Sequence, residues 1–338
     1  MRGLVEGLGR ARGRRRLAAV AAVAALTLAA SGCVTVHGER AVVPTATTDE
    51  AERALAEFTT AYNAADWAYD PSLDAHRVTG SLGAINQAGL KARSVTHPDG
   101  NPDHRPLELS DVRWAIPKKA GWPRWFVADA DSNLDTDRGA GDNRWVLLFV
   151  REGSDRMWEA AHLAVLAPGD VPAFRRDADG WAEAAPADGA SLAAAPADLS
   201  REYAAYLKTG EPKVFAAGPH TSGLRENRTR IANRPGLALQ FADQALDSGP
   251  FAPVGLVTED GGALVFFSSR FFERRTAAQG YRPKVTPAEK PLLSGDVRNT
   301  LTKEWVAGLT ARVAPAGAEG DRVRVVNRMQ GVTALKGS

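Results

Sequence analysis

Apolar positions in the first part of the chain have helical spacing and are followed by shorter runs with strand spacing. Two helices are expected first, with apolar faces formed by Leu55, Phe58 and Tyr62 and by Leu82, Ile85 and Leu90. Thr48 or Asp49 can cap the first of them. Four runs rich in Trp, Val, Phe and Leu then predict strands near residues 107–116, 123–130, 144–151 and 157–166.

The same order recurs in the second part. A helix is expected at Asp198–Thr209, with Leu199, Tyr203, Tyr206 and Leu207 on one side. Strands are expected near residues 237–246, 253–258, 263–273, 300–314 and 321–329. Alternation is clearest in the last two, where Trp305, Ala307, Leu309, Ala311 and Val313 share one face, and Arg322, Arg324 and Arg328 point opposite to Val323 and Val325. Helices followed by an antiparallel sheet, twice, predict an α+β fold of two tandem domains.

A small-residue run separates the two parts. Residues 183–197 read EAAPADGASLAAAPA, with no aromatic or β-branched residue, and this composition is typical of a linker. The predicted organisation is therefore a first domain over residues 49–182, a linker over 183–197 and a second domain over 198–338.

The N-terminus has the pattern of an export signal. Its basic residues are Arg2, Arg10, Arg12, Arg14, Arg15 and Arg16, and an uncharged stretch runs from Leu17 to Ala30. Ser31-Gly32-Cys33 follows, so residues 1–32 are interpreted as a signal peptide and residues 33–48 as a tether. Ala30-Ser31-Gly32-Cys33 resembles the lipobox of bacterial lipoproteins, in which the cysteine carries the lipid. The alternative is that Leu17–Val36 remains as an uncleaved anchor.

Cys33 is the only cysteine. With its thiol used for lipid, the chain has no disulfide, no cysteine nucleophile and no cysteine-ligated zinc site. Both interpretations of the N-terminus place the rest of the chain on the extracytoplasmic face of the cell membrane.

Two helices that lead into a curved antiparallel sheet resemble the nuclear-transport-factor-2-like (cystatin-like) fold. The whole chain also resembles lipoproteins of high-GC Gram-positive bacteria, whose Ala-, Arg- and Gly-rich composition it shares. The resemblance rests on pattern alone, so it assigns no functional residue. The fold hosts enzymes and binding modules alike.

Charge differs between the two parts. Residues 198–338 carry 20 basic and 14 acidic side chains, whereas residues 33–197 carry 16 and 25. One interpretation is a pair of solvated surfaces that attract each other. The other is that the basic part faces an anionic partner, such as lipid headgroups or an anionic wall polymer. An unknown envelope protein is a further partner class, and nucleic acid is not expected in this compartment.

One acidic stretch has the spacing of a calcium loop. With Asp131 counted as position 1, oxygen-bearing side chains fall at positions 1, 3, 5, 7 and 12. These residues are Asp131, Asn133, Asp135, Asp137 and Asp142. Thr136 stands where an EF-hand loop has glycine, and position 12 lacks glutamate. A polar hairpin loop is therefore the alternative. No cofactor is predicted.

Two further groups are candidates for ligand contact. His97, Asp99, Asp103 and His104 lie within eight residues and resemble a metal site, but two prolines and a glycine also make this segment a turn-rich loop. Seven of the eight tryptophans lie in the first part, where they either fill the core or grip a ligand.

No G-x-S-x-G, S-x-x-K, H-E-x-x-H, Walker or G-x-G-x-x-G motif is present. We therefore interpret the chain as a surface-anchored lipoprotein that acts as a non-catalytic binding or accessory module of the cell envelope. The alternative is an envelope enzyme whose acid and base come together from distant strands.

Overall fold

The computed structural model describes residues 41–136 and 138–338, and residues 42–338 form one compact unit. No helix in this part of the chain is long and apolar enough to cross a membrane. The signal peptide, Cys33 and the alternative anchor Leu17–Val36 lie outside the described residues.

The first part contains two helices, α2 (Thr48–Ala68) and α3 (Gly80–Thr96). The cap of α2 is Thr47 rather than Thr48 or Asp49: its side chain accepts a hydrogen bond from Glu50 N, and the Glu50 carboxylate accepts one from Thr47 N. An antiparallel sheet of four strands follows in the order β2 (Leu109–Ala115), β4 (Arg124–Ser132), β5 (Arg144–Arg151) and β6 (Glu159–Leu166). Val43–Pro44 (β1) pairs separately with Lys118–Lys119 (β3).

The second part contains α4 (Leu199–Thr209) and α5 (Ser222–Ile231) and a sheet of seven strands. Its strands are β7 (Asn233–Arg234), β8 (Leu237–Leu246), β9 (Val254–Val257), β10 (Ala263–Ala277), β11 (Leu293–Ser294), β12 (Thr300–Val313) and β13 (Val323–Gly337). The order across the sheet is β11-β13-β12-β10-β8-β7, with β9 paired to β10. Only the β11–β13 pair among the described strand pairs of this sheet is parallel. The predicted α+β fold with antiparallel sheets is confirmed.

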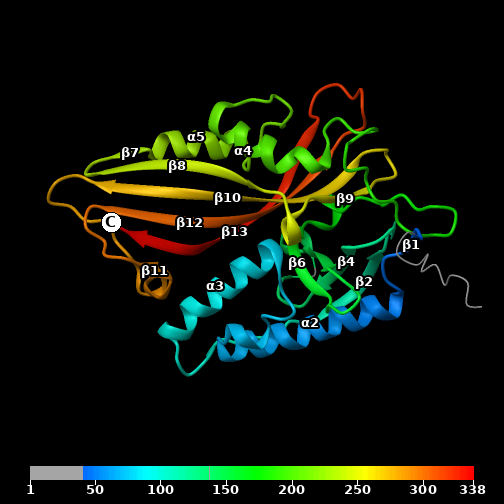
Figure 1. Cartoon of the computed structure of the whole chain (residues 1–338), viewed down its shortest axis with the longest axis horizontal. Coiled ribbons are helices and arrows are strands. Elements are labelled where there is room, and N and C mark those ends of the chain that lie inside the picture. The colour runs from blue at the N-terminus through cyan, green and yellow to red at the C-terminus, as the bar shows by residue number, and fades with distance from the viewer. Residues whose placement is uncertain (1–40, 137) are drawn as a thin grey trace, which may run out of the picture. The chain divides into compact units, whose positions relative to one another are not determined.

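Helices cover both faces of the large sheet (Figure 1). α4 and α5 lie over one face and α3 lies against the other, where it contacts β13 and β12. The predicted apolar face of α4 is buried, and Leu199 and Tyr203 are inaccessible to solvent. They pack with Ala307, Leu309 and other core residues of the large sheet.

A third apolar cluster joins the two parts of the chain. It contains Val127, Leu148 and Ala164 from the small sheet and Leu256 and Phe266 from the large one. These side chains are at most 4% exposed, so the inner faces of the two sheets share one core.

The segment predicted as a linker is packed in the structure. Ala185 N donates to Gly255 O and Ala193 N donates to Ala314 O, and Leu192 is buried in the core beneath α4. Small side chains suit this position because they let the backbone lie close to the strands. The segment thus lies within the one compact unit of residues 42–338, which contains both the four-stranded and the seven-stranded sheet, and the division into two domains stays a prediction.

This packing leads to a proteolysis prediction. Mild thermolysin treatment is expected to leave residues 183–197 intact, because cleavage needs a locally unfolded backbone and this segment is held by hydrogen bonds to strands. Mass spectrometry of the digest checks this. Release of two folded pieces after cutting within residues 183–197 would instead support separate domains.

One strand departs from the predicted alternation. Across β12 and β13, Ala311 faces Val325 but Thr310 faces Asn327, so β13 contains an extra residue at Val326. This bulge reverses the alternation beyond it and brings Arg328 to the same face as Val325. The Arg328 guanidinium lies 5.3 Å from the Phe271 ring centre, so the prediction that Arg328 points away from this core face was wrong.

Candidate functional site

A cleft of about 370 Å³ lies where the two parts of the chain meet. It is lined by residues of β2 and β4, by the segment 171–176, and by Glu259 from the turn between β9 and β10. Hydrogen bonds from Arg175 N to Val257 O and from Glu259 N to Ala173 O fix this segment beside β9. The cleft is therefore assembled from elements that are far apart in sequence.

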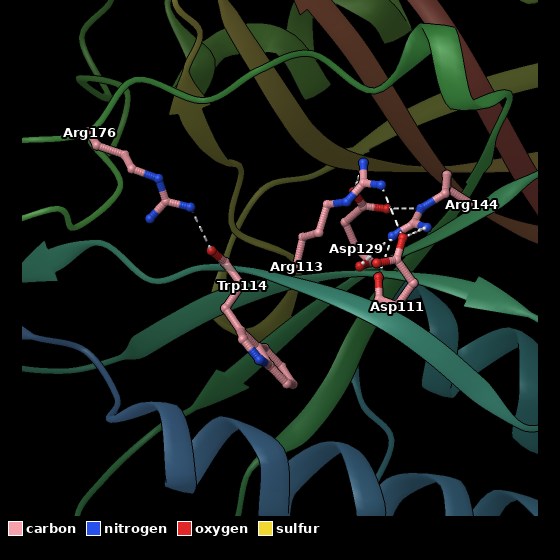
Figure 2. A network of polar contacts seen from close by, with 6 residues as sticks. All are labelled: Asp111, Arg113, Trp114, Asp129, Arg144 and Arg176. Carbon is pink, nitrogen blue, oxygen red and sulfur yellow. Dashed lines mark hydrogen bonds and ion pairs between the residues drawn. The ribbon is translucent and has the colours of Figure 1, made fainter.

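A buried ion pair lies beside the cleft (Figure 2). Asp129 on β4 and Arg144 on β5 have side chains that are 5% and 6% exposed, and Arg144 Nε donates to Asp129 Oδ1 at 2.7 Å. Arg144 Nη2 donates to the backbone oxygens of Asp129 and Asp111. This arrangement uses the Asp129 carboxylate as a counter-charge, and buried pairs of this kind are stable only when their remaining donors are also satisfied.

Asp111 completes the network through an unusual backbone. It lies at the irregularity between Ser110 and Arg113 on β2 and has φ of +43°, in the left-handed region that aspartate tolerates. This turns its carboxylate toward Arg144, whose Nη1 donates to Asp111 Oδ2 at 2.8 Å. The hydrogen bond from Arg144 and the charge of Arg113 lower the pKa of Asp111.

Two arginines line the cleft from different sides. Arg113, whose side chain is 65% exposed, donates to Asp111 Oδ2 at 3.0 Å and lies 3.9 Å from Asp129 Oδ2. Arg176 donates to the backbone oxygens of Trp114 and Gly180. In Figure 2 the Trp114 ring points away from both guanidiniums, and it packs edge-on against Phe126 in the core.

The remaining lining is mostly apolar. Ala115, Val171, Pro172, Ala173 and Phe174 supply it, together with the Glu259 carboxylate. Arginines beside an apolar lining suit a ligand that has an acidic group and an apolar portion, because a guanidinium binds carboxylate or phosphate through paired donors.

The sequence did not point to this cleft. None of Asp129, Arg113, Arg144 and Arg176 belongs to a sequence motif. A usable signal was present: Asp129 and Arg144 are charges at the buried positions of apolar strands, and such charges are almost always paired.

Two side chains of the calcium candidate form hydrogen bonds with the backbone next to the loop. Asn133 Oδ1 accepts from Glu108 N, Asn133 Nδ2 donates to Pro106 O, and Asp135 Oδ2 accepts from Asn143 N. Asp131 lies on β4, Asp142 is half-buried, and Asp137 lies outside the described residues. A calcium site here stays a prediction.

These engaged side chains favour a solvated hairpin loop. We expect about 1 mM Ca²⁺ to raise the melting temperature no more than NaCl of equal ionic strength does. The variant carrying Asp131→Ala and Asp135→Ala should respond like the parent chain. A calcium-specific rise that this variant loses would contradict the expectation.

The histidine-containing loop is held by a local staple. His104 Nδ1 lies 2.8 Å from Asp66 Oδ2, which also accepts from Asn101 Nδ2, so the loop is fixed to the end of α2. In residues 41–136 and 138–338, no group of three or more His, Cys, Asp or Glu is placed to hold a metal ion.

Most tryptophans of the first part belong to the core. Trp125 and Trp158 are buried, and Trp114, Trp145 and Trp181 pack on the cluster beneath α2. Trp67 is 64% exposed. Trp122 lies next to two arginine side chains, Arg124 and Arg151.

A buried histidine links the two sheets. His162 on β6 is 3% exposed. Its Nδ1 lies 3.2 Å from the Ser81 hydroxyl, and its Nε2 lies 3.2 Å from the Thr310 hydroxyl. The adjoining cavity has a volume of only about 10 Å³, so this Ser–His pair has no room for a substrate. Burial lowers the pKa of His162 to about 3.

This pKa predicts a loss of stability in acid. Folded His162 stays neutral down to about pH 3, whereas in the unfolded chain it is protonated below about pH 6.5. The unfolded state therefore binds the extra proton in this window, and the free energy of unfolding falls by up to about 1.4 kcal/mol for each pH unit below 6.5. Urea unfolding at pH 7.5 and 5.0 should show a smaller loss for His162→Gln than for the parent.

A second group titrates in the opposite direction. Burial raises the pKa of Asp74 to about 6, so this carboxyl stabilises the fold as the pH falls from about 6 toward 3.8. The parent and the His162→Gln variant both contain Asp74, so its contribution cancels when the acid-induced losses of stability of the two proteins are compared. An equal acid loss in parent and variant would contradict the assignment to His162.

Fold and cleft together define an α+β protein with two antiparallel sheets and an arginine-lined cleft at their junction. The chain belongs to the family described as Domain of unknown function (DUF8094), whose model matches residues 42–337.

Relatives in Streptomyces match nearly the whole chain. An uncharacterised lipoprotein of Streptomyces coelicolor, SCO2278, is 51% identical over 96% of this chain and 97% of its own length. An uncharacterised lipoprotein of Streptomyces avermitilis is 52% identical over 94% of each chain. A second S. coelicolor protein, the uncharacterised lipoprotein SCO6871, is 25% identical over 92% of each. The predicted likeness to lipoproteins of high-GC Gram-positive bacteria is thus confirmed.

Proposed function

We propose that this protein is an extracytoplasmic binding module of the cell envelope, held to the membrane by lipid on Cys33, and that the cleft at Arg113 and Arg176 takes its ligand. The names of its relatives support a lipoprotein. The helices that precede each antiparallel sheet support the resemblance to the nuclear-transport-factor-2-like fold, which we keep as part of the proposal.

A single observation carries the binding role. Asp129, one of the two carboxylates that line the cleft (the other is Glu259), is held by Arg144, whereas Arg113 and Arg176 present guanidiniums beside an apolar lining. A carboxylate paired with a buried arginine is a poor proton acceptor, because protonation would leave the guanidinium without its counter-charge. The geometry therefore favours recognition of an anionic group over acid–base chemistry.

The ligand class follows from the lining. Arginine pairs with carboxylate or phosphate, and Phe174 with Val171 and Pro172 offers an apolar contact. Both anions occur in envelope material, as peptide carboxylates and as wall-polymer phosphates. A small fragment of either kind fits a volume of about 370 Å³.

Titration calorimetry of the full-length protein tests this with two probes, D-alanyl-D-alanine for the carboxylate and glycerol 3-phosphate for the phosphate. Saturable binding of one probe is expected, and replacing both arginines (Arg113→Gln, Arg176→Gln) should weaken it at least tenfold. Arg282→Gln removes an exposed arginine that does not line the cleft and should leave affinity unchanged.

The outcomes separate the alternatives. Binding that survives loss of both arginines, or no saturable binding of either probe, contradicts the proposal. Recovery of the bound probe unchanged supports a binding module, whereas turnover of the probe supports the enzyme alternative.

A further inference from the structure

The N-terminal end of the compact unit is pinned beside a basic hairpin. Val43 pairs with Lys119 in the β1–β3 ladder, and Thr45 N donates to Pro117 O at 2.9 Å. Thr45 is buried, and its hydroxyl donates to Trp125 O at 2.7 Å. The chain therefore enters the fold at a fixed point, directly next to the turn that follows β3.

Four side chains at this point form what we call the basic rim: Lys119, Trp122, Arg124 and Arg151. The guanidiniums of Arg124 and Arg151 lie 4.6 and 5.5 Å from the Trp122 ring centre, and the two arginines are direct partners across β4 and β5. Burial and the charge of Arg124 lower the pKa of Lys119, which ends β3 five positions before Arg124.

The rim is short of counter-charge. In the described part of the chain, neither Lys119 nor Arg124 forms an ion pair, and Arg124 Nε is buried without a hydrogen-bond partner. Arg151 has one acidic neighbour, Glu50, at 3.8 Å. The adjacent Lys118 differs because it is paired with Asp177 and Asp179. Like charges held together repel, and an anionic surface that faces them offsets this repulsion.

The length of chain between Cys33 and Val43 limits which anionic surface the basic rim can reach. Nine residues separate Cys33 from Val43, and a chain of this length reaches at most about 35 Å. A lipid on Cys33 would therefore keep the basic rim close to the bilayer. Lysine and arginine beside a membrane are attracted to anionic headgroups, and tryptophan is favoured at the membrane interface.

We propose that the basic rim docks on the anionic lipid headgroups of the membrane to which the protein is anchored. This inference rests on the proposed lipid anchor. Docking would give the protein a defined orientation on the membrane, which a tether alone does not provide.

The test uses the lipidated full-length protein with Ala120→Cys, an exposed position beside Lys119. Cys33 is blocked by lipid, so this thiol is the one available for a fluorescent label. Proteins are reconstituted in vesicles of phosphatidylcholine with or without phosphatidylglycerol, and quenching by a headgroup nitroxide lipid is measured. Quenching is expected in the anionic vesicles and should fall at high salt.

Charge variants make the test specific. Lys119→Gln with Arg124→Gln should lower the ratio of docked to undocked protein about thirtyfold, since each cation near an anionic surface contributes about a fivefold factor. Arg124→Lys keeps the charge and should stay docked. Lys290→Gln with Arg282→Gln removes two cations elsewhere and serves as the matched control.

Failure of the lipid anchor and failure of docking by the basic rim give different results in this assay. Without an anchor, protein is lost from the vesicles. Protein that stays with the vesicles but is unquenched, is quenched equally in neutral and anionic lipid, or is quenched in the Lys119 and Arg124 double variant overturns the docking proposal.

Discussion

Replacing Cys33 with serine is expected to move nearly all of the protein from the membrane fraction to the soluble fraction. Serine has no thiol to carry the lipid, and burial of acyl chains, about 0.8 kcal/mol for each CH₂, is what would hold the protein to the bilayer. Cys33 lies outside the compact unit of residues 42–338, so the melting temperature should stay within about 1 °C.

Fractionation of cells with an alkaline carbonate wash, followed by immunoblotting, measures the change. Thr35→Ser alters a neighbouring residue without removing the thiol and should remain membrane-bound. A Cys33→Ser protein that still sediments after the wash would favour the alternative, an uncleaved anchor at Leu17–Val36.

The second large effect is expected at the buried ion pair. Arg144→Met removes the guanidinium that pairs with Asp129 and leaves this carboxylate, which is 5% exposed, with Arg113 at 3.9 Å as its remaining cation. Breaking a buried pair in this way costs about 3–5 kcal/mol, so urea should unfold the variant at a much lower concentration. Circular dichroism across a urea series gives the free energy of unfolding.

Two further variants separate charge from packing. Removing both charges, with Arg144→Met and Asp129→Leu together, should recover much of the loss because no unpaired charge stays buried. Arg113 belongs to the same network, but its side chain is 65% exposed. Arg113→Met should therefore lower the free energy of unfolding by less than about 1 kcal/mol. Equal losses in Arg144→Met and Arg113→Met would show that burial of the pair does not matter.

Local sequence predicted the secondary structure well because spacing along the chain decides it. The apolar residues of α4 recur at helical spacing, and β8 spans Leu237–Leu246, the range that alternation indicated. Short-range patterns did not predict the bulge at Val326, since a bulge is set by the neighbouring strand as well as by its own residues. The orientation of Arg328 was wrong for that reason.

The cleft could not be predicted because its residues meet only when the sheets pack. Arg113 and Arg176 are 63 positions apart, and Glu259 comes from a turn of the other sheet. No spacing rule connects residues at such separations. The basic rim was missed for a similar cause: Arg151 becomes a neighbour of Arg124 only through β4–β5 pairing, whereas sequence charge counts made the first part of the chain simply acidic.

The sequence by itself determined the single cysteine, the α+β class and the position of every described strand longer than two residues, because each depends on residues that are close in the chain. The export signal stays a prediction. Only the tertiary structure decided that residues 183–197 are packed and that both sheets share one core. It also decided which arginines are neutralised by a carboxylate and which are not. These features depend on contacts between residues that are far apart in the sequence. In this chain the packing of the four-stranded sheet against the seven-stranded sheet makes those contacts.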